Sequence, residues 1–493
     1  MVSVYLDGHD FTYEVNELVK LFFFDDEISF IQDEKEYTGK GFLIKNHLLK
    51  VESDYSSIAI IVYDNDVISE YKVDSINNID IKRDGIVKKI KTGIKQSIYV
   101  ALSNILEVKV PWGILTGVRP TKIVHDLIDK GLDKNSIYDV LTKEYKLFSD
   151  KANTIIDIAK VQREYIYPIS KDRFSLYISI PFCPTRCIYC SFPSNSMDVG
   201  RRYVDEYTDK IIYELKSISK YLKNKKMHTV YIGGGTPTAI PTKNLDRIIK
   251  NIYELYGKEN IKEITVEAGR PDTIDKEKLQ MLKSNDINRI SINPQTMNEE
   301  TLKLIGRKHT EKDIIKAFAL AKDIGFDVIN MDIIVGLPEE GTDELANTLD
   351  EILKLNPENL TVHTLAVKRA SIFSKSIKEF SMESQSTIEN MLNMSRKYAE
   401  KMNLRPYYLY RQKHMLGNFE NTGYSIEGKE CIYNMLIMEE KETILAVGAG
   451  GVSKIYYPDE NRLERVPNVK NLKDYLERID EMVERKRMYI DTI

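Results

Sequence analysis

The hydrophobic pattern of the first third of the chain changes from that of strands to that of helices. Over residues 1–85, short runs rich in aromatic and β-branched residues alternate with acidic and asparagine-containing turns, which is typical of strands. Over residues 86–170, apolar residues recur at helical spacing around a proline- and glycine-containing loop at 111–122. We therefore predict a small antiparallel β unit at 1–85 and a helical segment with a linker at 86–170, together an N-terminal α+β region.

From residue 175 the pattern alternates between strands and helices. Six apolar runs of strand length are separated by stretches with helical spacing, and these runs are SLYISI (175–180), HTVYIGG (228–234), EITVEA (263–268), RISINP (289–294), VINMDIIVG (328–336) and NLTVHTLA (359–366). Such repeats predict a parallel sheet with right-handed crossovers. Six units are fewer than the eight of a closed barrel, so both a partial barrel and an open sheet fit. We assign this core to 171–370 and a C-terminal extension, a candidate substrate cover, to 371–493.

The net charge and the length of the apolar runs indicate which kinds of partner the protein binds. The chain has 71 Lys and Arg against 75 Asp and Glu, a net charge of −4, so no net positive field attracts nucleic acid or anionic lipid. The longest apolar runs are far shorter than the ~20 residues of a membrane helix, and the N-terminus has no apolar signal segment. We expect a cytoplasmic protein with a small-molecule substrate and with neither nucleic acid nor membrane as a partner.

Three of the four cysteines lie close together, directly after the first strand of the core. Cys183, Cys187 and Cys190 occupy a loop that opens the carboxyl end of the sheet, where functional residues gather in such folds. In a reducing compartment, clustered thiols indicate metal ligands or redox groups, and thiolates hold iron-sulfur clusters and zinc. A structural zinc needs a fourth ligand, and no further cysteine or histidine lies nearby. Three protein ligands would leave one iron of a cluster open to another ligand, whereas the isolated Cys431 fits a core thiol.

A glycine-rich turn follows the second strand of the core. Gly233, Gly234, Gly235, Thr236 and Pro237 form GGGTP. Glycines at this position allow a ligand to approach the backbone closely, where amides and carbonyls meet the charged head group of an amino acid. By itself GGGTP also fits a tight turn, but its place one βα unit after the cysteine loop favours a ligand site.

These two motifs together carry a family resemblance. CxxxCxxC with an aromatic residue before its last cysteine, followed by GGGTP, resembles the radical S-adenosylmethionine (SAM) superfamily. From about Tyr177 to Lys454 the chain is most similar to the oxygen-independent coproporphyrinogen III oxidases (coproporphyrinogen dehydrogenases), specifically their HemZ-type branch. The resemblance implies an α/β fold with a partial (β/α)6 radical SAM barrel, the N-terminal α+β region and a short C-terminal α/β extension. It also implies a 4Fe-4S cluster on the three cysteines, with SAM on the open iron.

The same resemblance assigns residues to SAM at successive strand ends. The positions that match SAM contacts of the family are Tyr177, Tyr189, Gly234, Gly235, Thr236, Glu267, Gln295, Arg307, Asp332 and Ala366. Tyr177 and Arg307 are also expected to be catalytic. The chemistry is consistent, because carboxylates suit ribose hydroxyls and an arginine can bind a carboxylate. Each residue also has a structural alternative: Glu267 as a helix cap, Asp332 paired with a lysine, and Arg307 as a solvated helix charge.

The implied activity is the oxygen-independent oxidative decarboxylation of coproporphyrinogen III to protoporphyrinogen IX in haem biosynthesis. A reduced cluster would cleave SAM to methionine and a 5′-deoxyadenosyl radical that abstracts hydrogen from a propionate β-carbon. The partners would be a tetrapyrrole substrate and an electron donor such as a flavodoxin or ferredoxin. Groups that could pair with propionates follow the last core strand or lie within 406–424, where a plain amphipathic strand fits equally well, and they are Lys368, Arg369, Arg411, Lys413 and His414.

Two departures from the family pattern leave alternatives open. Ser179 stands where the porphyrinogen oxidases usually carry histidine, and Ser191 and Phe192 follow the cluster where the bacterial type has a further cysteine. One SAM molecule or two therefore fit. A radical SAM enzyme acting on a non-porphyrin substrate is the nearest alternative function. A haem chaperone is a further one, but the stretch that corresponds to its HNxxYW signature, residues 433–438, has no histidine to ligate haem iron.

Overall fold

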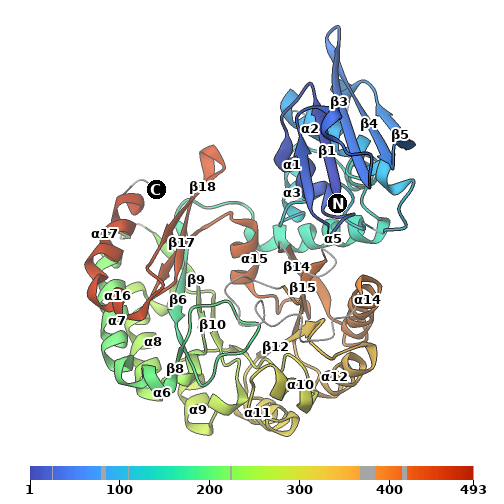
Figure 1. The fold of residues 1–493 in the computed structure, drawn as a ribbon. Helices are drawn as coiled ribbons and strands as arrows, with labels where there is room; N and C mark the ends of the chain where they lie inside the picture. The colour runs from blue at the N-terminus through green and yellow to red at the C-terminus, as the bar shows by residue number, and fades with distance from the viewer. Residues whose placement is uncertain are drawn as a thin grey trace. The chain divides into compact units, whose positions relative to one another are not determined.

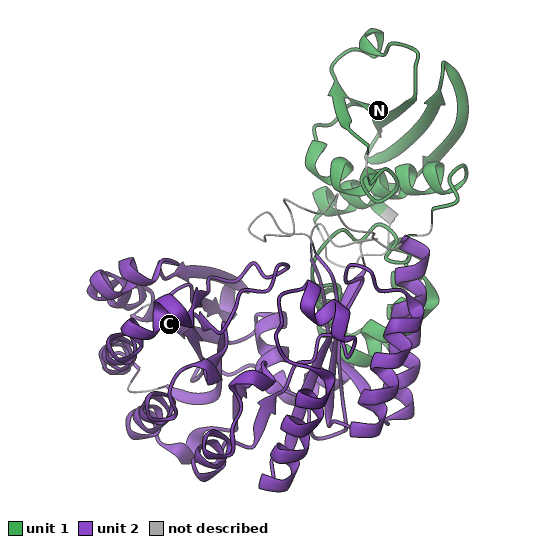
Figure 2. Cartoon of the chain, turned by 60° about the horizontal axis from the view of Figure 1, so that its bottom comes forward, with its two compact units in different colours: residues 1–159 green, residues 160–493 purple. Residues whose placement is uncertain are grey.

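The computed structural model describes residues 1–24, 26–78, 85–108, 110–222, 225–366, 384–412 and 419–491. These residues form two compact units, 1–159 and 160–493, each considered by itself below (Figure 2). The finer division predicted from the hydrophobic pattern, with boundaries near residues 85, 170 and 370, stays a prediction. Within the described ranges, no helix combines the length and apolar character needed to cross a membrane.

The first unit contains a five-stranded sheet in the order β2-β1-β3-β4-β5. Its elements are β1 (Val2–Asp7), α1 (Thr12–Val19), β2 (Ile28–Ile31), β3 (Phe42–Val51), β4 (Asp54–Tyr63) and β5 (Asp66–Val73). The prediction of an antiparallel unit is correct only for β3 to β5, because β1 lies parallel to both β2 and β3. Parallel pairing of β1 and β2 needs a crossover, and the short helix α1 supplies it. Helix α1 was not predicted, because its apolar residues are followed closely by the apolar run Leu21 to Phe24, which masks the helical spacing.

The helices predicted after residue 85 are present. They are α2 (Ile86–Ser103), α3 (Thr121–Asp129), α4 (Lys134–Asp139) and α5 (Ser149–Ile166). Helix α2 packs on β4 and β5 and buries Ile90, Ile94 and Ile98 on one stripe. The loop at 111–122 joins α2 to α3, and its Trp112 is buried in the core of this unit.

The second unit is built on a curved sheet with helices along its outer side (Figure 1). All six predicted strands are present and parallel, and they are β6 (Arg173–Ile180), β9 (Lys226–Gly234), β10 (Glu263–Glu267), β11 (Arg289–Ser291), β12 (Val328–Val335) and β13 (Asn359–Thr364). The helices of the crossovers are α7 (Val204–Ser219), α8 (Thr242–Tyr256), α9 (Lys276–Ser284), α10 (Glu299–Leu304), α11 (Glu311–Ile324) and α12 (Thr342–Leu355). Two short strands, β7 (Phe182–Cys183) and β8 (Asn195–Ser196), and helix α6 (Met197–Gly200) follow β6.

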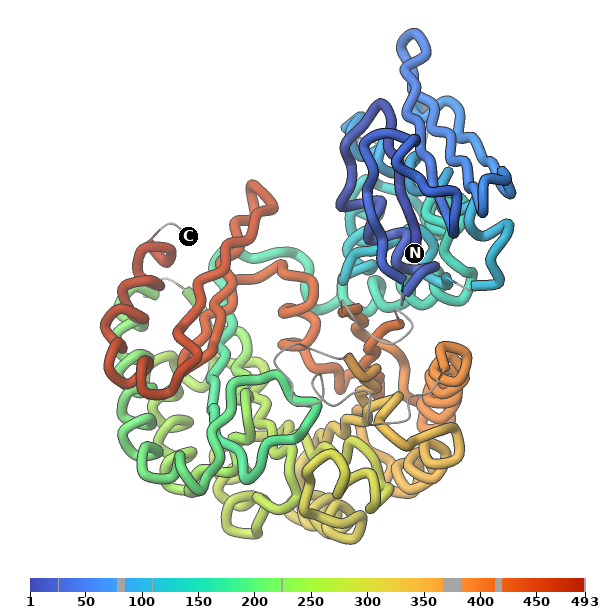
Figure 3. Tube along the Cα trace, in the orientation of Figure 1, coloured from blue at the N-terminus to red at the C-terminus, as the bar shows by residue number. Residues whose placement is uncertain are grey.

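The C-terminal extension adds strands to both edges of this sheet. At one edge β16 (Thr443–Val447) lies parallel to β6 and continues into β17 (Val452–Tyr457) and β18 (Arg462–Pro467), so segments far apart in sequence lie side by side (Figure 3). At the other edge β15 (Glu420–Ser425) pairs antiparallel with β13, and β14 (Arg405–Arg411) pairs with β15. Helices α14 (Gln385–Lys401), α15 (Ile432–Glu439), α16 (Leu472–Glu477) and α17 (Ile479–Ile490) complete it. Among the described strands, the sheet begins at β14 and ends at β18, and these two edge strands do not pair with each other. The barrel is therefore partial.

Alternation along the strands separates the core from the inner face of the half-barrel. On β6, Phe174, Leu176 and Ile178 join the hydrophobic core with residues of the outer helices, such as Ile211 and Leu215 of α7. Side chains of a strand alternate between its two faces. The intervening positions of β6 and β9 therefore face inward, and they are polar, aromatic or glycine: Ser175, Tyr177, Ser179, Thr229, Tyr231 and Gly233.

The lower part of the half-barrel, at the amino ends of the strands, is filled by the start of helix α15. The Glu263 carboxylate accepts hydrogen bonds from the backbone N–H groups of Ile432 (2.9 Å) and Tyr433 (3.1 Å) and from the Cys431 thiol (3.3 Å). The Arg289 guanidinium lies 3.3 Å from the same carboxylate. Cys431 is a buried structural thiol, as predicted.

Candidate functional site

The cluster loop, residues 183–190, carries its three thiols at the carboxyl end of β6. Cys187 is buried, and Cys183 and Cys190 are half-buried. Burial raises the pKa of the Cys183 thiol to about 11, and the neighbouring sulfurs of Cys190 and Cys187 add to this effect. Burial also raises the pKa of Cys190. Burial and the neighbouring sulfurs oppose ionisation of Cys183 and Cys190, and bound iron would compensate the thiolate charges, so the cluster loop makes a good metal site.

The chemistry of these donors fits an iron-sulfur cluster better than a single ion. Three sulfurs, with no histidine or carboxylate among them, are the soft ligands that such clusters use. Among the described residues, no group of three or more His, Cys, Asp or Glu side chains is arranged to hold one metal ion. A cluster does not require such an arrangement, because each cysteine binds a different iron.

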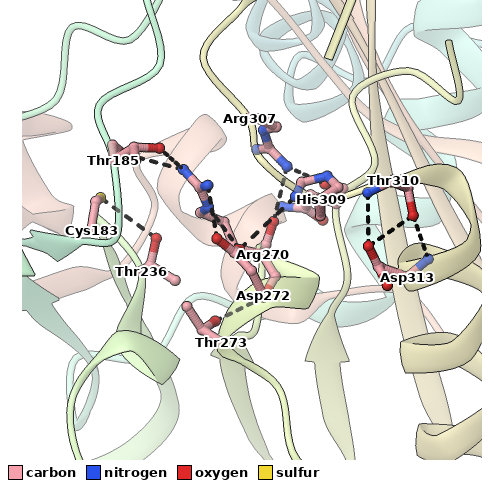
Figure 4. Close-up of polar contacts among 12 residues, drawn as sticks. Cys183, Thr185, Thr236, Arg270, Asp272, Thr273, Arg307, His309, Thr310 and Asp313 are labelled. Carbon is pink, nitrogen blue, oxygen red and sulfur yellow. Dashed lines mark hydrogen bonds and ion pairs between the residues drawn. The ribbon is translucent and has the colours of Figure 1, made fainter. Parts of the chain in front are cut away.

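The GGGTP turn packs directly against the cluster loop. Thr236 Oγ1 donates to Cys183 Sγ over 3.5 Å (Figure 4). A Cβ atom on Gly235 would lie 2.7 Å from the Phe182 carbonyl oxygen and 2.8 Å from Cys183 Sγ, so only glycine fits. Gly234 has φ +112°, and a Cβ there would lie 2.9 Å from the Ile180 backbone nitrogen. The turn therefore brings bare backbone next to the cysteines, as a ligand shared between the two would require.

Arg307 is buried beside the cluster loop and has an unused donor. Its Nη1 donates to the carbonyl oxygens of Asn293 (2.6 Å) and Gly269 (3.3 Å), while its Nε has no hydrogen-bond partner among the described residues. Burial opposes its charge, but neighbouring Tyr189 and Cys187 outweigh this and raise the pKa of Arg307 above its usual value. A buried, charged guanidinium with a free N–H suits an anionic ligand group such as the carboxylate of SAM.

Gln295 connects this arginine region to the next strand. Its side-chain oxygen accepts a hydrogen bond from the Tyr189 hydroxyl over 3.0 Å. Its backbone has φ +68° and exchanges hydrogen bonds with Asp332 and Ile334 of β12. Two residues assigned to SAM by resemblance, Tyr189 and Gln295, are thus in direct contact although 106 positions separate them.

Two carboxylates face the inner side of the half-barrel. Burial raises the pKa of Glu267 to about 7, although its carboxylate accepts a hydrogen bond from the Tyr231 hydroxyl over 2.8 Å. The charge of Asp332 also raises the pKa of Glu267, so the two groups share one interior. Burial opposes ionisation of Asp332, but contacts with His363 and Asn330 outweigh it and lower the pKa of Asp332. His363 Nε2 lies 3.7 Å from the Asp332 carboxylate.

Tyr177 belongs to a stack of three tyrosine rings inside the half-barrel. Its ring centroid lies 6.2 Å from that of Tyr231 and 6.2 Å from that of Tyr433, and the last two are 4.6 Å apart. Ser179, two residues after Tyr177, donates from its hydroxyl to the Ala449 carbonyl and so ties β6 to the loop after β16. The serine at the usual histidine position thus has a structural contact in this chain, because it joins two segments of the half-barrel.

The structural alternatives for the three charged residues do not apply. Helix α9 begins beyond Glu267 and is capped by Asp275, whose side chain accepts from the Lys278 backbone N–H. Asp332 faces His363 and not a lysine. Arg307 is buried and not solvated.

Some of the predicted positions lie apart from these contacts. Ala366 is half-buried, two residues beyond the end of β13. Arg411 is buried at the end of β14, and this burial lowers its pKa to about 10. Four of the candidate propionate partners lie outside the described residues, and they are Lys368, Arg369, Lys413 and His414.

Sequence reasoning missed Arg270 and Asp272, which lie next to the cluster loop. Arg270 is buried three residues after Glu267 and reaches Thr185, between Cys183 and Cys187 (Figure 4). The signal that could have found it is its position directly after the third core strand, at the edge where functional residues gather.

The fold and the site together define a radical SAM protein. Residues 177–352 match the model of the radical SAM superfamily. The structure of coproporphyrinogen III oxidase (HemN) from Escherichia coli has the same fold, with a TM-score of 0.52 and 23% identity over 66% of this chain and 73% of that chain. Members of the superfamily use a 4Fe-4S cluster and SAM, so these are the cofactors of this chain.

The chain belongs to the HemZ family of oxygen-independent coproporphyrinogen-III oxidase-like proteins. It is 40% identical to the Bacillus subtilis protein of that name over 409 residues, which cover 81% of this chain and 82% of the relative. It is also similar to the heme chaperone HemW of Bacillus subtilis, with 34% identity over 40% of this chain and 52% of the relative. HemW of Escherichia coli is 26% identical over 62% of this chain and 75% of the relative.

Proposed function

We propose that this protein catalyses the oxygen-independent oxidative decarboxylation of coproporphyrinogen III to protoporphyrinogen IX, a step of haem biosynthesis, in the cytoplasm. The observation that carries the proposal is the grouping of the cluster loop, the GGGTP turn and Arg307 at one end of the half-barrel, in a chain that matches HemZ over most of its length. When bound, the cluster and SAM supply a radical able to remove hydrogen from an unreactive carbon.

The residues of the site have distinct tasks in this proposal. Cys183, Cys187 and Cys190 hold the cluster, and the bare backbone of the GGGTP turn lies beside SAM. Arg307 offers its unpartnered Nε–H to the SAM carboxylate. Glu267 and Asp332 accept hydrogen bonds from the ribose hydroxyls, which places the nucleoside against the inner face of the half-barrel.

The inner face of the half-barrel suits a flat ring system. Tyr177, Tyr231 and Tyr433 stack with interplanar angles of 17° to 25°, and Tyr408 stacks on Tyr410 at 6°. Of these rings, Tyr177, Tyr231 and Tyr410 are only half-buried, so they can contact the pyrrole rings. Hydrogen is removed from a propionate β-carbon; loss of CO2 and of one electron to an acceptor then leaves a vinyl group, and this occurs twice. The electron that reduces the cluster comes from a donor such as a flavodoxin or ferredoxin.

Haem carriage, the activity named for the HemW relatives, fits this chain less well. The residue at the start of the stretch that corresponds to the haem-binding signature is Tyr433. Its side chain is buried in the tyrosine stack, and its backbone N–H is bound by Glu263. A buried phenol in a ring stack is not placed to ligate an exogenous haem iron.

Product analysis tests the proposal. Protein with a reconstituted cluster is incubated anaerobically with a reductant, SAM and coproporphyrinogen III, and porphyrinogens and 5′-deoxyadenosine are quantified by mass spectrometry. We expect products with one and then two vinyl groups, and none with Cys187→Ala. Cleavage of SAM without vinyl products would favour a different substrate. Tight haem binding with no SAM cleavage by cluster-loaded protein would favour the chaperone.

A further inference from the structure

Arg270 is a buried cation that no part of the proposed reaction uses. It lies three residues beyond the end of β10 and has 3% of its surface exposed. Figure 4 shows its guanidinium between Thr185 of the cluster loop and Asp272. A charged side chain is buried at considerable cost unless it is paired and hydrogen-bonded, so its contacts indicate its role.

The guanidinium makes two sets of contacts with different segments. On one side Nε and Nη2 each donate to an oxygen of Asp272 over 3.0 Å, a two-bond fork that fixes the plane of the arginine. On the other side Nη1 donates to the Thr185 hydroxyl (2.9 Å) and carbonyl oxygen (3.2 Å). The fork therefore anchors Arg270, and the remaining donors hold the cluster loop.

Thr185 connects Arg270 to the segment before Arg307 by hydrogen bonds. Its hydroxyl accepts from Arg270 and donates to the Gly306 carbonyl over 2.9 Å. The backbone N–H of Ile188, also in the cluster loop, donates to the Ile305 carbonyl over 3.2 Å. Together with these backbone contacts, Arg270 connects the end of β10, the cluster loop and the segment that carries Arg307.

Arg270 also contributes a positive charge next to the cysteines. Its guanidinium is bound to Thr185, which lies between Cys183 and Cys187 in the cluster loop. The nearest histidine, His309, adds no positive charge near neutral pH, because burial and the charges of Arg307 and Arg270 lower its pKa to about 4. Where solvent is excluded, a fixed positive charge favours the more negative of two redox states.

We propose that Arg270 is a positioning residue of the cluster, which fixes the cluster loop through Thr185 and makes reduction of the cluster easier through its charge. The proposal concerns the cluster alone and does not depend on the identity of the substrate. It separates two effects, since the fork geometry belongs only to arginine whereas lysine keeps the charge.

Four variants separate geometry from charge. Arg270→Lys keeps the charge and loses the fork, Arg270→Gln loses both, Thr185→Val removes the hydroxyl that Arg270 binds, and Thr185→Ser retains it. The matched control is Arg289→Lys, because Arg289 is equally buried but binds Glu263 at the opposite end of the half-barrel. For each reconstituted variant, the measurements are the rate of iron loss to a chelator, the cluster midpoint potential by titration monitored with electron paramagnetic resonance, and the melting temperature.

Each variant has its own expected outcome. Arg270→Lys, Arg270→Gln and Thr185→Val should lose iron about 10-fold faster than the wild type, the usual effect of removing an outer-shell partner, while Thr185→Ser should not. Only Arg270→Gln should have a more negative midpoint potential. Arg289→Lys should lower the melting temperature and leave iron loss and potential unchanged.

Two results would overturn the proposal. The first is iron loss at the wild-type rate in both Arg270→Lys and Thr185→Val. This result would overturn the proposal even if Arg270→Gln fails to fold. The other is an equal change of iron loss and potential in Arg289→Lys, which would reduce the effect of Arg270 to general stability. No substrate enters these measurements, so their failure is distinguishable from failure of the proposed activity.

Discussion

Glu267 and Asp332 are carboxylates of one interior whose surroundings push their pKa values in opposite directions. Glu267 has a phenol, a backbone N–H and a neighbouring carboxylate around it, so burial prevails and its pKa rises to about 7. Asp332 has His363 and Asn330 beside it, which outweigh burial and lower its pKa. Near neutral pH, one of the two groups is therefore ionised while the other is poised between its two forms.

This difference predicts a pH dependence of SAM binding. Below about pH 7 Glu267 carries a proton, and above it the carboxylate accepts hydrogen bonds from hydroxyls more strongly, so SAM affinity should increase as the pH rises through 7. Glu267→Gln should abolish this increase and bind SAM about tenfold more weakly at pH 8. Anaerobic calorimetry on cluster-loaded protein measures both.

Asp332→Asn supplies the control for that prediction. Removing the neighbouring charge eases ionisation of Glu267, so the midpoint of the pH dependence should move to lower pH. A wild-type affinity that is constant between pH 5.5 and 8.5, or an unmoved midpoint in Asp332→Asn, would contradict the assignment of the dependence to Glu267.

At the scale of elements, the core strands could be predicted and their edge partners could not. Periodicity identifies β6 and β9 to β13 because each is a parallel strand of the sheet with an apolar run of strand length. The same periodicity places the candidate site, since the cluster loop follows β6 and Glu267 is the last residue of β10. Long-range pairing leaves no local signal: β16 joins β6 with Thr443 opposite Phe174, and the contact of Arg270 with Thr185 depends on the fold of two separate loops.

Glu214 of α7 illustrates the same limit. It lies near a helical stripe of apolar residues and is completely buried because Lys486 of α17 pairs with it over 2.6 Å. Its carboxylate also accepts from the Tyr475 hydroxyl (2.6 Å), the Asn468 side chain (3.0 Å) and the Gly448 backbone N–H (3.0 Å). This network joins α7, α16 and α17 to the loop after β16.

Breaking the pair should therefore be costly. Lys486→Met leaves a buried carboxylate without its cation and should lower the free energy of unfolding by about 3–5 kcal/mol, whereas Glu214→Gln combined with Lys486→Met should recover part of that loss. Urea unfolding followed by circular dichroism measures the difference. The control, Lys303→Met, removes an exposed pair with Glu300 and should change stability by less than about 1 kcal/mol. Equal effects of the buried and exposed substitutions would refute the network's role.

At the scale of the whole molecule, the candidate site draws on residues from Tyr177 to His363, and only the complete half-barrel brings them together. Overall charge is close to neutral, so anionic groups are bound by placed cations rather than by a basic surface. Arg307 and Arg270 are such cations: in the proposed function Arg307 offers its Nε–H to SAM, and Arg270 holds the cluster loop through Thr185. The first unit, with its own sheet and helices, lies outside the segment that matches the superfamily.

The most direct test of the proposed activity follows a hydrogen atom from substrate to cofactor. Coproporphyrinogen III deuterated at the propionate β-carbons is supplied anaerobically to the reduced, cluster-loaded protein with SAM, and 5′-deoxyadenosine is analysed by mass spectrometry. We predict deuterium in 5′-deoxyadenosine in proportion to the vinyl groups formed, and neither product with Cys187→Ala. Formation of 5′-deoxyadenosine that contains no deuterium while the porphyrinogen keeps all its propionates would contradict the account.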